Sequence, residues 1–274
     1  MEKNLFLQFK SHLKLTTLKS YANLYDRLRK HFDADLEDQS CEDLIRIIEE
    51  IDDKTTTQLN LLNVVIIIKQ LFNKKLEKLI EKRELITQKQ NETRKITNKS
   101  LTHILPTIKE LNDFLDILFQ QKKWKEFIVN FLIINFNTRN ADLFIDIVET
   151  MPLPEENTSN YLVLEKDRVL YIRNIYKTSK TYSKKEDYIT DDRFIYAVKE
   201  CGMGALICNR FGVKIGLDVL GSYVKRYTYR QLGEIIIFKS IMKEASLSNI
   251  SNLSSNRGSS VPTILQYYYT DGLS

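Results

Sequence analysis

Four short segments of the chain carry arginine, lysine and tyrosine side chains whose types suit chemistry on a phosphodiester. Arginine keeps its charge and offers a planar fork of donors that matches phosphate oxygens. A tyrosine phenol can attack phosphorus and hold it as a covalent intermediate. In chain order the segments are LIINFNTRNADLFIDI with Arg139, NIYKTSKTYSKKEDYI with Lys177 and Lys180, SYVKRYTYRQLG with Arg226, and RGSSVPTILQYYYT with Tyr267.

The order and local patterns of these segments resemble the catalytic domain of the tyrosine recombinase and integrase family. There, an apolar helix and a short turn precede an arginine, and an acid and a leucine follow it, as Asp142 and Leu143 do here. The family's essential lysine lies in a turn between two strands, where Lys177 is the best match and Lys180 the second. The family patterns H-x-x-R-H-T-F and G-H-S-S-x-x-T-T-x-x-Y are matched at Arg226, Thr228, Ser259, Ser260, Thr263 and Tyr267.

All three histidines of the two family patterns are replaced in this chain, and Tyr223 and Tyr227 stand in the two histidine columns of the first pattern. The hydroxyl of Tyr223 is expected to donate to the phosphate. Gly258 stands in the histidine column of the second pattern, so Asn256 or Arg257 is the candidate to reach the phosphate instead. The replacements leave two hypotheses open: an active enzyme, or a relic that binds DNA without cutting it.

The resemblance implies a role for each matched side chain. Tyr267 is the expected nucleophile, and Tyr268 and Tyr269 are rivals, because a slip of one residue rotates a helical side chain by about 100°. Attack by this tyrosine gives a 3′-phosphotyrosine, which conserves the energy of the phosphodiester bond. The resemblance therefore implies no cofactor and no metal.

The remaining matched residues are expected to act on the charge that develops during cleavage. Arg139 and Arg226 form the clamp on the phosphate oxygens. Lys177, or Lys180 in its place, is the general acid for the departing 5′ oxygen. Asp142 is expected to orient Arg139 from behind.

The elements that must position these residues are mainly helical. Helical spacing recurs from Leu18, a helix capped by Ser40 follows, and the apolar run at 64–68 is expected inside a long helix. Residues 88–100 turn polar and are interpreted as a helix end and a linker. Further helices are expected in LPTIKELNDFLDILF (105–119), from Trp124 to about Phe136, near Arg193, across 216–245 and around the closing tyrosines.

Two other regions depart from the helical pattern. Short β-rich runs between 151 and 190 predict a small antiparallel sheet. The segment SLSNISNLSSNRGSS is expected to be a Ser/Asn-rich loop. The fold class is thus mainly α with a small antiparallel β-sheet. The resemblance implies a helical core-binding domain that clamps DNA at 1–98 and a catalytic domain of tyrosine recombinase type at 99–274.

Composition narrows the class of protein. The 274 residues are 43% hydrophobic and 28% charged, with a net charge of +5, a balance typical of a globular protein and mildly basic. No run reaches the roughly 20 apolar residues of a membrane span, and the N-terminus lacks a signal-peptide pattern. The three cysteines are scattered along the chain and predict a reducing intracellular compartment. All three histidines lie at or before residue 103, so no zinc site is expected.

The function expected from the resemblance is site-specific recombination or integration in a virus or other mobile element. The partner is double-stranded DNA, with a homo-oligomer on DNA (a tetramer when two sites are paired) and no membrane. Host cytoplasm, nucleus or a virus factory would satisfy the predicted compartment. Two alternatives remain: a type IB topoisomerase-like enzyme that relaxes DNA, and a catalytically weakened DNA-binding relic.

Overall fold

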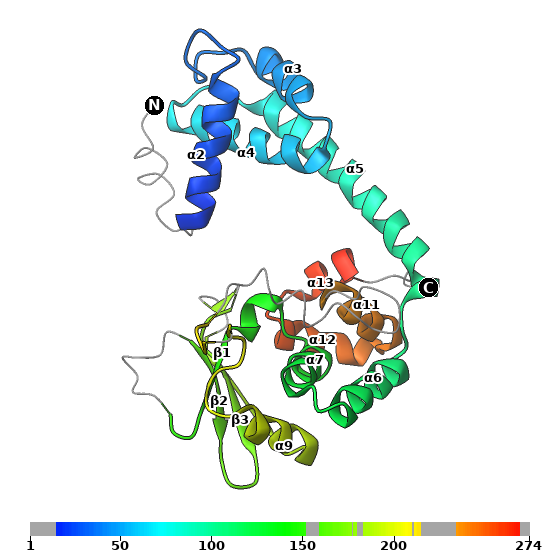
Figure 1. Ribbon diagram of the computed structural model, residues 1–274. Helices are drawn as coiled ribbons and strands as arrows, with labels where there is room; N and C mark the ends of the chain where they lie inside the picture. Colours follow the sequence, from blue (N-terminus) through cyan, green and yellow to red (C-terminus); the bar gives the residue numbers. More distant parts are fainter. Residues whose placement is uncertain are drawn as a thin grey trace. The chain divides into compact units, whose positions relative to one another are not determined.

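A computed structural model describes residues 15–151, 159–176, 178–179, 183–209, 211–214 and 234–268. The chain divides into two compact units, Met1–Ile96 and Thr97–Ser274. The described elements of the first unit are helical, and the second combines helices with one sheet (Figure 1). Among the described helices, none combines the length and apolar character needed to cross a membrane.

The first unit is built around a buried helix. Its helices are α2 (Leu15–Arg29), α3 (Cys41–Ile51), α4 (Thr55–Leu71) and the greater part of α5 (Glu77–Leu101). The run VVIII at 64–68 lies inside α4 and is buried on every side, which confirms the helix expected there. Ser40 caps α3, as expected, by accepting a hydrogen bond from the backbone N–H of Asp43.

Helix α5 contradicts the linker expected at 88–100, because the helix continues without interruption to Leu101. The polar residues of this stretch are mostly good helix formers, and their polarity reflects exposure rather than irregular backbone. Side-chain bonds along the helix add support: Arg94 donates to Asn91 Oδ1 at 3.0 Å and to Gln90 Oε1 at 3.4 Å.

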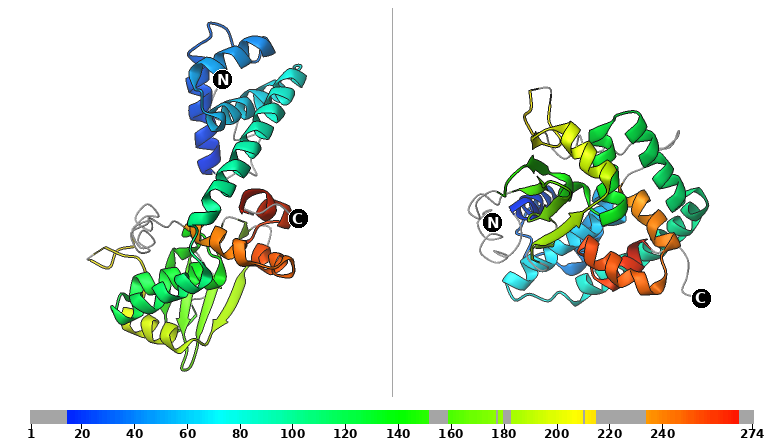
Figure 2. Two further views of the ribbon diagram at one scale, coloured as in Figure 1. Left: turned by 90° about the vertical axis from the view of Figure 1, so that its right-hand side faces the viewer. Right: turned by 90° about the horizontal axis from the view of Figure 1, so that it is seen from below.

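The helices of the second unit surround one apolar helix, α7 (Trp124–Phe136). Its neighbours are α6 (Ile108–Gln120), α9 (Asp192–Cys201) and α11 (Glu234–Glu244). Thr107 and Glu110 form a capping box that starts α6, and Glu244 at the end of α11 accepts from the backbone N–H of Ile108. Helices α12 (Leu247–Arg257) and α13 (Val261–Tyr268) pack beside α11 (Figure 2).

The five-stranded sheet is mixed, which corrects the antiparallel sheet expected from the sequence. Its order is β4-β3-β2-β1-β5, with β1 (Ile145–Val148), β2 (Asn160–Leu164), β3 (Val169–Arg173), β4 (Lys185–Ile189) and β5 (Gly204–Ala205). The pairs β2–β3 and β3–β4 are antiparallel as predicted, whereas β1 runs parallel to β2. Strand β1 was not predicted from the sequence, because its four residues extend the apolar stretch that comes soon after helix α7.

Helix α12 corrects a second expectation, the Ser/Asn-rich loop before the closing helix. Serine and asparagine favour caps and turns over helix interiors, so propensity alone argues against a helix here. Packing prevails because Ile250 and Leu253 join an apolar cluster with α11 and α13. The helix ends at Gly258, which takes the left-handed conformation (φ 61°) and donates to the Ser255 carbonyl at 2.9 Å.

Candidate functional site

Arg139 lies where the buried helix α7 meets the sheet. Asn137 ends α7 in the left-handed conformation, and a short 3₁₀ turn, η2 (Asn140–Leu143), follows at once. The backbone N–H of Arg139 donates to Asp142 Oδ2 at 3.1 Å. Asp142 is 1% exposed, and burial raises the pKa of its carboxyl against the opposing effect of Arg139. The carboxylate therefore braces the turn that carries Arg139.

The sheet fixes this turn through the carbonyl of Asp142. Asn160 of β2 donates to that oxygen at 2.9 Å, and the Tyr171 hydroxyl of β3 donates to it at 3.3 Å. Asn160 also exchanges hydrogen bonds with the backbone of Ile175, at the start of the β3–β4 hairpin. Asn160 thus joins the turn of Arg139 to the hairpin, a role that its sequence context did not reveal.

The side chain of Arg139 meets the last of the four motifs. Its Nη2 donates to Ser259 Oγ at 2.6 Å, a contact between residues 120 positions apart. Burial lowers the pKa of the guanidinium, and nearby Arg257 lowers it further. The Nη1 atom is buried and has no hydrogen-bond partner within the described part of the chain. Arg139 therefore retains a donor for an anion beside Ser259.

The side chain of Arg257 points into the protein and binds groups there. Its guanidinium is 1% exposed, pairs with Glu234 at the start of α11 and donates to the Asn137 carbonyl at 3.3 Å. It also stacks on the Phe238 ring at 4.1 Å. These contacts make Arg257 a link between α7, α11 and α12, so the hypothesis that Arg257 reaches a phosphate gains no support.

Gly258 is aligned with the histidine of the G-H-S-S pattern and faces the hairpin between β3 and β4. A Cβ at this position would lie 2.6 Å from Thr178 Oγ1 and 3.0 Å from Tyr176 Cε2. Thr178 Oγ1 donates to the Gly258 carbonyl at 2.6 Å. Side chains of the hairpin fill the space that a larger residue at position 258 would need. A histidine at position 258 would therefore collide with this hairpin.

Two further cations lie under the end of α12, and neither belongs to a motif that the sequence reveals. Arg173 of β3 is 2% exposed, pairs with Asp187 at 2.8 Å and donates to the Asn256 carbonyl at 2.9 Å. Lys185 of β4 donates to the same carbonyl at 3.2 Å and to that of Ser255. Burial, reinforced by Arg173, lowers the pKa of Lys185 to about 8. Both bind the carbonyl of Asn256, which lies in the last turn of α12, where carbonyls lack partners from the regular hydrogen bonds of the helix.

The two described tyrosines of α13 lie in different surroundings. Tyr267 is 38% exposed, and its backbone carbonyl accepts from Asn98 Nδ2 at 3.1 Å. The Tyr268 ring packs edge-on against Phe238, with centroids 4.9 Å apart, and its hydroxyl accepts from Arg257 at 3.4 Å. Tyr267 is thus accessible to a large substrate, whereas Tyr268 is packed beside the arginine cluster.

The remaining predicted residues cannot be located in the same way. Lys177, Lys180, Tyr223, Arg226 and Tyr269 lie outside the described residues. Within the described ranges, the structure brings together Arg139, Asp142 and the Ser259–Tyr268 segment. No group of three or more His, Cys, Asp or Glu side chains in these ranges could hold a metal ion.

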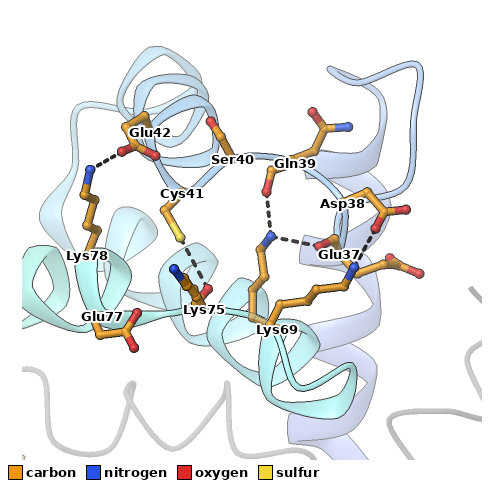
Figure 3. A pocket seen from close by; sticks show the side chains of 11 residues that line it. Glu37, Asp38, Gln39, Ser40, Cys41, Glu42, Lys69, Lys75, Glu77 and Lys78 are labelled. Atoms are coloured by element: carbon orange, nitrogen blue, oxygen red, sulfur yellow. Dashed lines mark hydrogen bonds and ion pairs between the residues drawn. The ribbon is translucent and has the colours of Figure 1, made fainter.

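A pocket of about 430 Å³ in the first unit is lined largely by charged side chains (Figure 3). Lys69 donates to the Glu37 carbonyl at 2.8 Å, and Lys74 pairs with Asp38 at 3.0 Å. The Cys41 thiol donates to the Lys75 carbonyl at 3.4 Å, and burial raises the pKa of this thiol. These contacts join the start of α3 and the segment before it to α4 and to the loop that follows α4, so the charged side chains that line the pocket have structural partners.

Comparisons with known proteins add little to this geometry. No protein-family model matches the chain, and none of the curated proteins matches its sequence. Among solved structures, the chain is similar to "Crystal structure of XerA recombinase" at 9% identity and a TM-score of 0.41. That similarity covers 98% of this chain and 94% of the other. Values this low leave the assignment of a family to the residues themselves.

Proposed function

We propose that the chain cuts and rejoins duplex DNA by the reaction of the tyrosine recombinases, as a site-specific recombinase or integrase. The contact between Arg139 Nη2 and Ser259 Oγ at 2.6 Å carries the proposal. It joins the motif of the first arginine to the motif of the tyrosine, which the sequence separates by 120 residues. Thr178, from the hairpin of the lysine motif, contacts Gly258 next to Ser259. If the three motifs were unrelated surface segments, they would not be expected to contact one another in this way.

The proposed reaction conserves the phosphodiester bond energy. The Tyr267 phenol loses its proton and attacks the scissile phosphorus, which forms a 3′-phosphotyrosine. The bond from phosphorus to the 5′ oxygen breaks, and Lys177, with Lys180 as the alternative, supplies the proton to that oxygen. Attack by a 5′ hydroxyl on the phosphotyrosine reverses the steps and restores the tyrosine. No oxidant, nucleotide or other cofactor enters the balance.

The arginines would lower the barrier of both steps. Charge accumulates on the non-bridging oxygens as phosphorus becomes pentavalent, and Arg139 and Arg226 would bind it. Loss of one such donor costs on the order of 2.7–4 kcal/mol of barrier. Asp142 holds the backbone of Arg139 and so would orient it, and the Tyr223 hydroxyl would donate in the first histidine column. The free Nη1 of Arg139 and its position beside Ser259 support this assignment.

The partner in this proposal is double-stranded DNA, which a helical clamp domain and the catalytic domain would each contact, with a homo-oligomer formed on paired sites. Phosphate contacts would supply most of the affinity. A second function, DNA binding without cleavage, is favoured by one observation. At Gly258 the hairpin occupies the space of the family's histidine, so the site lacks that hydrogen-bond donor and has no room to regain it.

A nicked suicide substrate separates the two functions. Cleavage releases a short fragment with a free 5′ hydroxyl, which diffuses away, so a covalent protein–DNA adduct accumulates if the tyrosine mechanism operates. We expect the parent chain to form the adduct, and Arg226→Ala and Arg139→Ala to lose it while binding DNA with nearly unchanged affinity. One phosphate contact is minor for binding but acts directly on the transition state.

Arg193→Ala is the matched control, because Arg193 is half-exposed and pairs with Asp116 away from the cluster. It should form the adduct like the parent. Full cleavage by Arg226→Ala would remove the assignment of the YVKRYTY segment. DNA binding without any adduct from the parent would establish the second function, and relaxation of supercoiled DNA by a monomer would favour the topoisomerase alternative.

A further inference from the structure

Asn98, in the last turn of α5, lies at a junction of three helices. Its side chain is 2% exposed. The Oδ1 atom accepts from Lys239 Nζ of α11 at 2.6 Å, and Nδ2 donates to the Tyr267 carbonyl of α13 at 3.1 Å. The two ends of one amide thus connect two helices that are distant in sequence.

The bond to Tyr267 meets a need of helix α13. Carbonyls near the end of a helix need donors from outside it, and Tyr267 is the last residue but one in the described part of α13. Asn98 supplies such a donor from another element. The same amide also accepts from a lysine that is only 8% exposed, and buried polar groups are costly unless their hydrogen bonds are satisfied. The arrangement therefore holds the end of α13 in one specific position.

A second contact holds α13 from its other flank. The Tyr268 ring packs on Phe238, the residue next to Lys239 on α11. Helix α11 therefore supports both the aromatic contact of Tyr268 and the amide that binds Tyr267. The Tyr267 carbonyl and the Tyr268 ring are thus both held in place, while the Tyr267 side chain remains 38% exposed.

We propose that Asn98 is a positioning residue that sets where Tyr267 stands, and that it couples α5 to the helix of the nucleophile. The inference rests on the proposed function of Tyr267. Helix α5 is continuous from Glu77 to Leu101, and the boundary between the two units falls within it, after Ile96. A rotation of the last turn of α5 would displace Asn98 and, through it, the carbonyl of Tyr267. Asn98 would thereby influence cleavage without contacting the reacting atoms.

Asn98→Asp tests the coupling with little change in shape. The carboxylate still accepts from Lys239 but can no longer donate to the Tyr267 carbonyl, which it instead repels. Asn91→Asp on the same helix is the matched control, because the Asn91 side chain accepts from Arg94 and leaves α13 untouched. The full-length chain is used throughout.

Three measurements are made on each variant: DNA affinity, the single-turnover rate of adduct formation, and hydrogen exchange of the amides at 261–268. The rate is measured on an ordinary nicked substrate and on one with a bridging 5′ sulfur, whose thiolate leaves without a proton. A misplaced nucleophile slows both substrates about 10- to 100-fold, because near-attack geometry is lost before the leaving group matters. We expect this loss in Asn98→Asp with faster exchange at 261–268, unchanged affinity, and none of these effects in Asn91→Asp.

The outcomes separate the inference from the proposed function. Equal rates for Asn98→Asp and the parent overturn the positioning role, even if the adduct forms. A slow rate that the sulfur substrate restores assigns Asn98 to protonation of the leaving group and also overturns it. If the parent forms no adduct, the proposed function fails, and the exchange at 261–268 alone decides whether Asn98 anchors α13.

Discussion

Tyr267 and Tyr268 are neighbours in the chain, but their side chains have different roles to fulfil. A nucleophile must reach a phosphate that arrives with a large substrate, and Tyr267 is the more exposed of the two. Tyr268 packs on Phe238 and binds Arg257 through its hydroxyl. We therefore keep Tyr267 as the proposed nucleophile and Tyr268 as the alternative, whose hydroxyl contacts Arg257.

We predict that Tyr267→Phe eliminates the adduct on a nicked substrate, while Tyr268→Phe and Tyr269→Phe retain it. Phenylalanine keeps the ring and its packing, so the hydroxyl is the only group lost. Denaturing gels of the trapped adduct provide the measurement. An adduct that persists in Tyr267→Phe and disappears in Tyr268→Phe would move the nucleophile by one residue. An adduct unaffected by all three changes would remove the tyrosine mechanism.

Gly258 illustrates how one position can constrain two elements. Its positive φ disfavours any side chain, and the Thr178 hydroxyl lies in the space of a Cβ. Gly212 also has a positive φ (77°), but a Cβ there would meet nothing within 4 Å. A comparison of Gly258 with Gly212 therefore separates the energetic cost of backbone strain from that of steric crowding.

We predict that Gly258→Ala destabilises the fold by more than Gly212→Ala. Strain alone costs of order 1–3 kcal/mol at either site, and displacement of Thr178 adds to the cost only at position 258. Urea unfolding of the two variants measures the difference. Because the hairpin packs on Gly258, we also expect Gly258→Ala to slow adduct formation. Equal destabilisation of the two variants would contradict the crowding.

Helices α11 and α12 meet through a buried ion pair. The side chain of Arg257 is 1% exposed and that of Glu234 is 11% exposed. Removing one partner leaves the other charge buried and unpaired, which is more costly than removing both. The exposed pair of Lys78 and Glu42 offers a contrast, because water already solvates both of its charges.

We predict that Glu234→Ala destabilises the chain by about 3–5 kcal/mol, whereas Glu42→Ala changes stability little. The double variant Glu234→Leu with Arg257→Met should lose less than the sum of its single changes. Chemical denaturation of the parent, Glu234→Leu, Arg257→Met and the double variant completes the cycle. Strict additivity would mean that the two side chains do not depend on one another.

The strand β4 carries a lysine whose charge is unfavourable in the folded state. Burial and Arg173 lower the pKa of Lys185 from an ordinary 10.5 to about 8, against the opposing charges of Asp142 and Asp187. Below about pH 8 both folded and unfolded states hold the proton, and the cost of the buried charge is constant. Between about 8 and 10.5 only the unfolded state binds the proton, so stability rises with pH.

We therefore predict that the parent gains stability relative to Lys185→Met as the pH increases from 8 toward 10. The difference between the two proteins isolates Lys185 from other groups that titrate in this range. Urea unfolding at several pH values gives the measurement. Lys184→Met is the control, since Lys184 is exposed and pairs with Glu186. A difference that stays flat or falls with pH would contradict the lowered pKa.

At the scale of the whole molecule, fewer cations are available for DNA than the composition implies. Residues 15–96 contain as many acidic as basic side chains. Several lysines of the first unit are already paired, including Lys74 with Asp38, Lys78 with Glu42 and Lys82 with Glu49. A clamp domain would therefore bind DNA with a selected face rather than with a general positive charge.

We predict that affinity for duplex DNA falls by orders of magnitude between low and moderately high salt, because phosphate contacts release counterions. The slope of log affinity against log salt should correspond to about 0.9 per phosphate contact. Fluorescence anisotropy over a salt series measures it. A flat response, or no binding to long duplexes at any salt, would contradict every version of the proposed function.

The sequence by itself determined the helices whose apolar residues follow one strong period. Helix α7 at Trp124–Phe136, the cap at Ser40 and the antiparallel strands β2 to β4 were all predictable, because local pattern and propensity agree there. The motifs containing Arg139, Ser259 and Tyr267 were also recognisable as residue types at fixed spacing. The roles of these residues, and of Lys177 and Arg226, remain predictions.

Only the tertiary structure decided the features that depend on distant contacts. Helix α12 forms against the propensity of its serines because Ile250 and Leu253 find apolar partners. Strand β1 exists because Asn160–Val163 offers it a parallel neighbour. Asn98, Asn160 and Lys185 bind backbone carbonyls far along the chain, and no local pattern marks such residues. Hydrogen bonds between distant segments follow from packing geometry, which a sequence encodes only as a whole.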